Sequence, residues 1–111
     1  MHEYGIALEI ANTAFKNAMG KDISKINLRL GELSGVFAES LAMYLDLIFQ
    51  EKQKCAPVLS VEKVAAKFKC SCGIEYAPPK IFDPCPSCGG FSRSVVDGNE
   101  CTIESIEVED G

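Results

Sequence analysis

Residues 70–90 read CSCGIEYAPPKIFDPCPSCGG, and this stretch holds four of the six cysteines in the 111-residue chain. Cys70 and Cys72 form a C-x-C pair, whereas Cys85 and Cys88 form a C-x-x-C pair followed by two glycines. Two such pairs separated by a short spacer are typical of a zinc ribbon, in which four thiolates bind one metal ion tetrahedrally. The C-x-C spacing requires a tighter turn than the usual C-x-x-C. We predict that these four cysteines are the ligands of one metal ion.

The segment around this stretch, residues 67–97, differs in composition from the rest of the chain. It holds four of the five prolines and few aliphatic side chains, so we do not expect it to fold around an apolar core. Tetrahedral thiolate sites favour zinc or iron, and zinc is the expected ion in a structural site. Zinc binding contributes on the order of 10 kcal/mol to the folding of small zinc modules. An alternative ligand set, in which Cys101 replaces one of the four cysteines, stays open.

Strands are predicted on both sides of the cysteine segment. Residues 58–68, VLSVEKVAAKF, are rich in β-branched valines, which favour strands. Residues 101–109, CTIESIEVE, contain apolar residues with a period of two, but Ile103 is out of phase with the later ones. A β-bulge near Glu104 would restore the phase, and a strand that changes neighbours would do the same.

The first half of the chain alternates helix and strand. Residues 4–19 and 38–53 carry apolar side chains three and four residues apart, which predicts two amphipathic helices. Residues 23–32, ISKINLRLGE, alternate apolar and polar side chains, which predicts a strand with one buried face that ends at Gly31. The predicted order is therefore helix, strand, helix, strand, cysteine segment, strand.

Composition excludes several classes of protein. The chain is 47% hydrophobic and 24% charged, which predicts a folded domain. Its net charge is −5, from 11 basic and 16 acidic side chains, so a nucleic-acid partner is not expected. We expect no membrane association, because the sequence has no apolar run of the roughly 20 residues that cross a bilayer and no signal peptide. We therefore predict a cytoplasmic protein, whose cysteines serve metal or redox chemistry rather than disulfides.

Cys55 and Cys101 stand apart from the cluster. Cys55 follows the second predicted helix and Cys101 opens the last predicted strand. Unpaired cysteines in such positions usually pack as small hydrophobic side chains. A redox pair between the two also stays open at this point.

The chain begins Met1-His2-Glu3, and His2 is its only histidine. A histidine here is either an ordinary surface residue or part of a metal site at the chain terminus. In the second case the terminal amine, the imidazole and the first backbone amides form a nitrogen-rich, square-planar set. That set suits nickel(II) or copper(II), and it requires a free N-terminus. The residues alone leave both interpretations open.

The whole chain resembles the HypA/HybF family, the nickel-incorporation proteins of [NiFe]-hydrogenase maturation. The resemblance rests on MHEYGIA at the start, LRLGELSGV at 28–36, the four-cysteine segment, and GNE with IESIEVE near the end. It implies an α+β fold, with two helices packed on a three-stranded sheet and an inserted, zinc-ribbon-like four-cysteine domain. The nickel-binding domain would be discontinuous, residues 1–66 and 98–111, with the zinc-binding domain at 67–97.

The resemblance also implies a nickel site. Its ligands would be the amine of Met1, the imidazole and amide of His2, and the amide of Glu3, whose carboxylate could coordinate or accept hydrogen bonds. Some family members carry an acidic side chain near the GELSGV segment. Here that segment is followed by Phe37 and Ala38, so any fifth nickel ligand is left open.

The function implied is that of a nickel metallochaperone rather than an enzyme. No nucleophile–base pair, phosphate loop or second histidine is visible in the sequence. The expected partners are the [NiFe]-hydrogenase large subunit, which would receive the nickel, and a nickel-handling GTPase. The expected state is a monomer or weak homodimer. The alternatives are a zinc-ribbon protein-interaction module, a rubredoxin-like electron carrier with iron in the thiolate site, and a thiol oxidoreductase.

Overall fold

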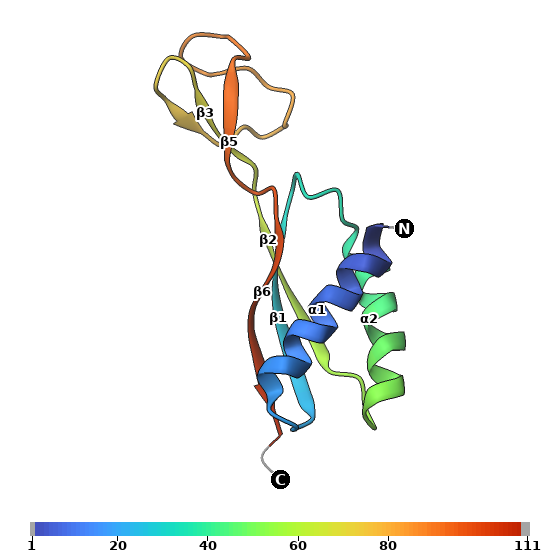
Figure 1. The fold of residues 1–111 in the computed structure, drawn as a ribbon. Coiled ribbons are helices and arrows are strands. Elements are labelled where there is room, and N and C mark those ends of the chain that lie inside the picture. The colour runs from blue at the N-terminus through green and yellow to red at the C-terminus, as the bar shows by residue number, and fades with distance from the viewer. Residues whose placement is uncertain (1, 110–111) are drawn as a thin grey trace.

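The computed structural model describes residues 2–109, and of His2 it describes the backbone alone. The described residues form two helices and six strands: α1 (His2–Ala18), β1 (Ile23–Gly31), α2 (Ala38–Lys52), β2 (Val58–Val64), β3 (Lys67–Cys70), β4 (Glu75–Tyr76), β5 (Arg93–Asp97) and β6 (Cys101–Val108). The strands make two separate sheets, in the orders β2-β1-β6 and β4-β3-β5. Figure 1 shows both helices beside the first sheet and the second sheet in a small module beyond its end. The predicted α+β fold is confirmed.

The first sheet is built around β1, which pairs in parallel with β2 and antiparallel with β6. The apolar residues Ile26, Leu28 and Leu30 are all buried, as their alternation predicts. The opposite face of the sheet is polar. On that face Arg29 Nε lies 3.3 Å from a carboxylate oxygen of Glu62 on β2. One face of the sheet therefore contributes to the core and the other faces solvent.

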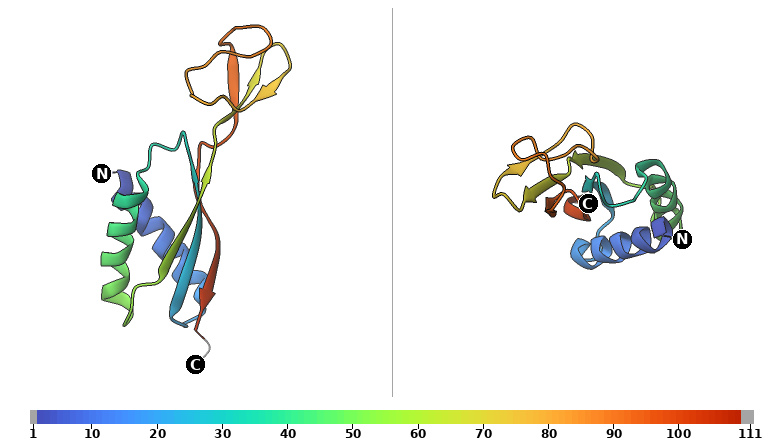
Figure 2. Two further views of the ribbon diagram at one scale, coloured as in Figure 1. Left: turned by 180° about the vertical axis from the view of Figure 1, so that it is seen from behind. Right: turned by 90° about the horizontal axis from the view of Figure 1, so that it is seen from above.

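Both helices lie on the apolar face of this sheet. In Figure 1 α1 crosses in front of the strands, and in the reverse view of Figure 2 the strands are in front. α1 turns a stripe of small residues inward, among them the buried Ala7, Ala11 and Ala14. Phe49 of α2 is fully buried, and its ring centroid lies 4.8 Å from that of Phe15 on α1. The alanine stripe leaves room for these larger side chains between the helices.

A β-bulge in β6 lies where the sequence predicts it. Asn27 of β1 pairs with Ser105, and the next residue, Leu28, pairs with Ile103, so Glu104 has no partner on β1. The extra residue restores the phase of the strand. Ile103 consequently packs against the helix-covered core, which a strand with strict alternation would not allow.

The predicted strand 58–68 is wrong as one element, because it divides between the two sheets. β2 ends at Val64, and β3 begins at Lys67. Between them the backbone N–H of the fully buried Ala66 donates to a side-chain oxygen of Glu32, at 2.8 Å. A contact between residues far apart in the sequence therefore separates β2 from β3 within a stretch that reads as one continuous strand.

The segment after β1 fastens the two sheets together. The backbone N–H of Glu32 donates to the carbonyl of Val64, and that of Leu33 donates to the carbonyl of Gly98. The Leu33 side chain packs against the apolar cluster of the second sheet.

The molecule is elongated, with extents of 56 × 26 × 18 Å. The radius of gyration is 17.3 Å, against about 13 Å for a compact domain of this length.

The expectation that the cysteine segment lacks an apolar core is wrong in one respect. A small buried cluster is present, and it includes two of the cysteines themselves: Ala66, Phe68, Cys70, Tyr76 and Cys85. The cluster is much smaller than the core beneath the helices.

The sequence does not predict β4 and β5, two strands of this second sheet. Neither strand shows alternating apolar and polar residues, because β4 has only two residues and β5 is largely exposed.

Candidate metal centres

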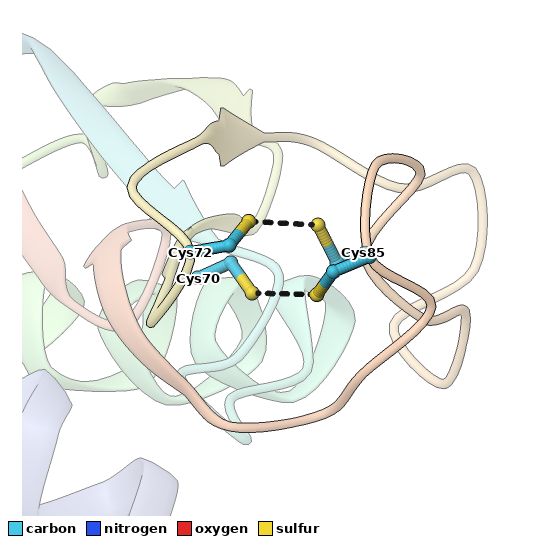
Figure 3. Close-up of side chains that lie close together, drawn as sticks. Cys70, Cys72 and Cys85 are labelled. Atoms are coloured by element: carbon cyan, nitrogen blue, oxygen red, sulfur yellow. Dashed lines mark hydrogen bonds between the residues drawn. The ribbon is translucent and has the colours of Figure 1, made fainter.

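Four cysteine sulfurs converge in the module formed by the second sheet and its loops, which is called the cysteine module below. The Sγ atoms of Cys70, Cys72, Cys85 and Cys88 all lie within 4.8 Å of one another. The Cys70–Cys88 sulfurs are 3.5 Å apart and the Cys72–Cys85 sulfurs 3.7 Å apart. A tetrahedral site with zinc–sulfur bonds of about 2.3 Å has sulfurs about 3.8 Å apart. The geometry therefore fits one four-coordinate metal ion, and Figure 3 shows Cys70 and Cys72 facing Cys85.

The first pair sits on the turn that joins β3 to β4. Cys70 is the last residue of β3, and its carbonyl accepts a hydrogen bond from the N–H of Gly73 at 2.9 Å. Gly73 has a φ of +100°, a conformation that favours glycine. The tight C-x-C spacing is accommodated because Gly73 reverses the chain directly after Cys72.

The second pair lies in the loop between β4 and β5. The N–H of Gly89 donates to the carbonyl of Cys85 at 2.9 Å, and the N–H of Cys85 donates to the carbonyl of Gly90 at 3.0 Å. These two bonds close a loop around the Cys85 sulfur. The N–H of Ser87 also donates to that sulfur, at 3.4 Å. The two cysteine pairs thus form two turns that face each other.

The thiols differ in acidity according to their place in each turn. The backbone N–H of Cys88, with that of Ser87, lowers the pKa of Cys85 to about 6. The backbone N–H of Cys72 likewise lowers the pKa of Cys70. At Cys72 the backbone N–H of Ile74 acts to lower the pKa, but the Cys70 thiol and burial together raise it to about 11. The first cysteine of each pair is therefore the one that most readily carries negative charge.

Arg93, at the start of β5, braces the loop that carries Cys85. Its guanidinium carbon lies 3.8 Å from the centroid of the Phe68 ring. The guanidinium also donates to the hydroxyl of Tyr76 at 3.2 Å, to the carbonyl of Asp83 at 3.0 Å and to the carbonyl of Ile81. Sequence reasoning misses this residue. The one available signal is that Arg93 is the only arginine in residues 67–97.

Two of the three residues expected to bind nickel, His2 and Glu3, begin α1. Met1 and the side chain of His2 lie outside the described residues. Glu3 lies in the first turn of α1 and is half-buried. Figures 1 and 2 both show the start of α1 beside the first turns of α2. There the ring centroids of Tyr4 and Tyr44 are 5.4 Å apart.

The comparison with protein families covers both regions. The family model described as "HypA: Hydrogenase/urease nickel incorporation, metallochaperone, hypA" matches residues 1–108. The chain belongs to the HypA family. The resemblance noted from the sequence is thereby confirmed, and with it the assignment to the nickel metallochaperones of hydrogenase maturation.

Individual HypA relatives match over nearly their whole length. The chain is 33% identical over 110 residues to hydrogenase maturation factor HypA of Geotalea uraniireducens strain Rf4, a match that covers 98% of this chain and 100% of that one. It is 36% identical over 114 residues to the factor of the same name from Dehalococcoides mccartyi strain CBDB1, covering 99% and 96%. The solution structure of the Ni metallochaperone HypA from Helicobacter pylori has the same fold, with a TM-score of 0.69, 18% identity and 96% coverage of both chains.

Cys55 and Cys101 do not join the four-cysteine cluster of this HypA family protein. Among the described residues, the group able to hold a metal ion includes neither of them. Cys55 is exposed, whereas Cys101 is half-buried at the start of β6. Burial raises the pKa of the Cys101 thiol. Cys101 also lines a cavity of about 410 Å³ beside α1.

Within residues 2–109, neither helix combines the length and the apolar character needed to cross a membrane.

Proposed function

We propose that this protein binds Ni(II) at its N-terminus and delivers it to the [NiFe]-hydrogenase large subunit. The observation that carries the proposal is the family match, which extends from residue 1 to residue 108 and so includes the Met1-His2-Glu3 start. Within this proposal the nickel-binding unit comprises residues 1–66 and 98–111, and residues 67–97 form a zinc-binding unit.

The proposed nickel ligands are the amine of Met1, the imidazole and amide of His2, and the amide of Glu3. The position of α1 supports this set, because the helix begins at His2. The first four N–H groups of a helix have no carbonyl acceptor one turn earlier. The His2 and Glu3 amides can therefore lose a proton and coordinate nickel without breaking a helical hydrogen bond. A set of amine, imidazole and amide nitrogens suits square-planar Ni(II).

The proposed zinc ligands are Cys70, Cys72, Cys85 and Cys88. The sulfur separations of 3.5 and 3.7 Å support one tetrahedral ion. Bound zinc supplies folding free energy to its module. In this proposal it holds the two cysteine turns together, which the small apolar cluster around them cannot do alone.

The proposed activity is transfer of a metal ion, not catalysis. Nickel is cargo, so it must be held weakly enough to be released to the next protein. We place the protein in the cytoplasm, as a monomer or weak homodimer, with a nickel-handling GTPase as its second partner. Its net charge of −5 is consistent with protein partners rather than nucleic acid.

A nickel titration tests the proposal. Calorimetry would compare the native chain, the His2→Ala variant and a version with extra residues before Met1, all loaded with zinc. We expect both altered forms to lose stoichiometric nickel binding and to keep their zinc. Tight, stoichiometric nickel binding in both altered forms would overturn the terminal site. A red, redox-active protein as purified would instead support the rubredoxin-like alternative.

A further inference from the structure

Side-chain packing helps to hold the first turn of α1 in place. Its backbone N–H groups have no helical acceptors, and helix ends fray for this reason. Ala7 is fully buried, but it lies in the second turn. The side chain of Tyr4, in the first turn, is 44% exposed. A contact made by Tyr4 therefore helps to fix the start of the helix.

That contact is with Tyr44 of α2. The two rings meet edge to face, with centroids 5.4 Å apart and an interplanar angle of 73°. Aromatic pairs favour this arrangement, in which the positive edge of one ring meets the negative face of the other. The pair joins the first turn of α1 to the second turn of α2.

Tyr44 is the firmly held member of the pair. It is half-buried and packs against the main core. Its neighbours Leu41 and Leu45 on α2 are both buried in that core. Tyr4 thus rests against a ring that the core keeps in place.

We propose that Tyr44 is a positioning residue for nickel. Its ring holds Tyr4, and with it the first turn of α1, in place beside the proposed ligands. This inference depends on the proposed function, because it assumes that nickel binds to residues 1–3. Neither ring is a ligand in this scheme. A segment that is already ordered loses less conformational freedom when it binds, so removal of the ring contact weakens binding and leaves the ligands unchanged.

The test uses variants at both ends of the contact. Tyr44→Ala is expected to weaken nickel binding about three- to tenfold, and to speed nickel release to a chelator by a similar factor. Tyr4→Ala should have the same effect, and the double variant should be little worse than either single variant. Tyr4→Phe keeps the ring contact and should bind nickel like the native protein. Met43→Ala, an exposed neighbour on α2, is the matched control.

Zinc content, thermal stability and the visible circular dichroism of bound nickel are measured alongside. We expect the nickel bands of Tyr44→Ala to keep their positions, because the ligand set is intact. Since Tyr4 is largely outside the core, Tyr4→Ala tests the contact even if Tyr44→Ala does not fold.

Three results would overturn the inference. They are native-like nickel affinity in Tyr4→Ala, strictly additive effects in the double variant, or a loss in Tyr4→Phe equal to that in Tyr4→Ala. If the inference alone is wrong, His2→Ala still loses nickel while the tyrosine variants keep it. If the proposed function is wrong, His2→Ala itself keeps nickel.

Discussion

Gly31 and Gly98 lie backbone against backbone where the chain passes between the two sheets. A Cβ atom added to Gly31 would overlap the carbonyl oxygen of Gly98. Gly98 has a φ of +87°, and a Cβ there would lie 2.7 Å from the carbonyl oxygen of Ala65. Three segments of chain therefore cross at a point that has no space for a side chain at either glycine.

Gly31→Ala is expected to lower the free energy of unfolding by about 1–3 kcal/mol, because the backbone must shift to admit the methyl group. Denaturant titration of the zinc-loaded protein measures the change. Gly5→Ala is the control, since a Cβ at Gly5 has nothing within 4 Å. It should instead stabilise α1, by up to about 1 kcal/mol. Equal stability of the two variants would show that the crossing tolerates a side chain.

Cys72→Ser and Cys88→Ser should each lower bound zinc well below one ion per chain. A serine hydroxyl is a poor zinc ligand, and each loss leaves a three-thiolate site. Metal analysis after dialysis against a chelator provides the measurement. Cys55→Ser, which changes an exposed cysteine outside the cluster, should keep its zinc. Zinc loss from Cys101→Ser, with retention in Cys88→Ser, would restore the alternative ligand set.

Arg93→Lys should destabilise the cysteine module by about 1–2 kcal/mol and speed zinc loss to a chelator. A lysine cannot reach the same carbonyls and stack on the Phe68 ring at once. The rate of zinc release, followed with a coloured chelator, gives the readout. Arg29→Lys is the matched control, because Arg29 pairs with an exposed Glu62 on the first sheet and such pairs contribute little. Identical release rates in both variants would contradict the bracing role.

Cys55 and Cys101 should differ in reactivity towards iodoacetamide. The thiolate is the reactive form, and burial raises the pKa of the Cys101 thiol. In the zinc-loaded protein at pH 8, peptide mass spectrometry should show Cys55 modified first. Cys101 should react faster as the pH rises towards its raised pKa. Faster modification of Cys101 than of Cys55 at pH 8 would be inconsistent with its burial.

The same pKa shift has a consequence for stability. The folded chain binds the Cys101 proton more firmly than the unfolded chain does, whose thiol has a pKa of about 8.5. The contribution of the Cys101 thiol to the free energy of unfolding is therefore fully present below the pKa of the unfolded thiol. It is lost as the pH rises through the higher pKa of the folded thiol. Cys101→Ala should show a smaller decline in stability between pH 8 and pH 10.

Local patterns predict most of the first sheet and its helices. The predicted helix 38–53 is observed as Ala38–Lys52, because helical periodicity depends on residues only three and four apart. The bulge at Glu104 was also predictable, since one residue out of phase in a strand needs one extra residue. In these regions the local preference and the tertiary packing agree.

What could not be predicted depends on residues far apart in sequence. The break between β2 and β3 follows from the Glu32 side chain, which accepts a hydrogen bond from Ala66. The role of Arg93 depends on a loop that only the folded module brings within reach. The nickel ligands are predicted from the sequence alone. Of the three residues in that prediction, Glu3 is the one whose side chain the structure describes.

The strand order also sets a sequence of events during synthesis. β1 is the middle strand of the first sheet, yet its partner β6 follows the whole cysteine module in the chain. At typical translation rates of about 5–20 residues per second, several seconds separate the two strands. During that interval one edge of β1 has no strand beside it. Every residue of the cysteine module is therefore synthesised before the strand that completes the first sheet.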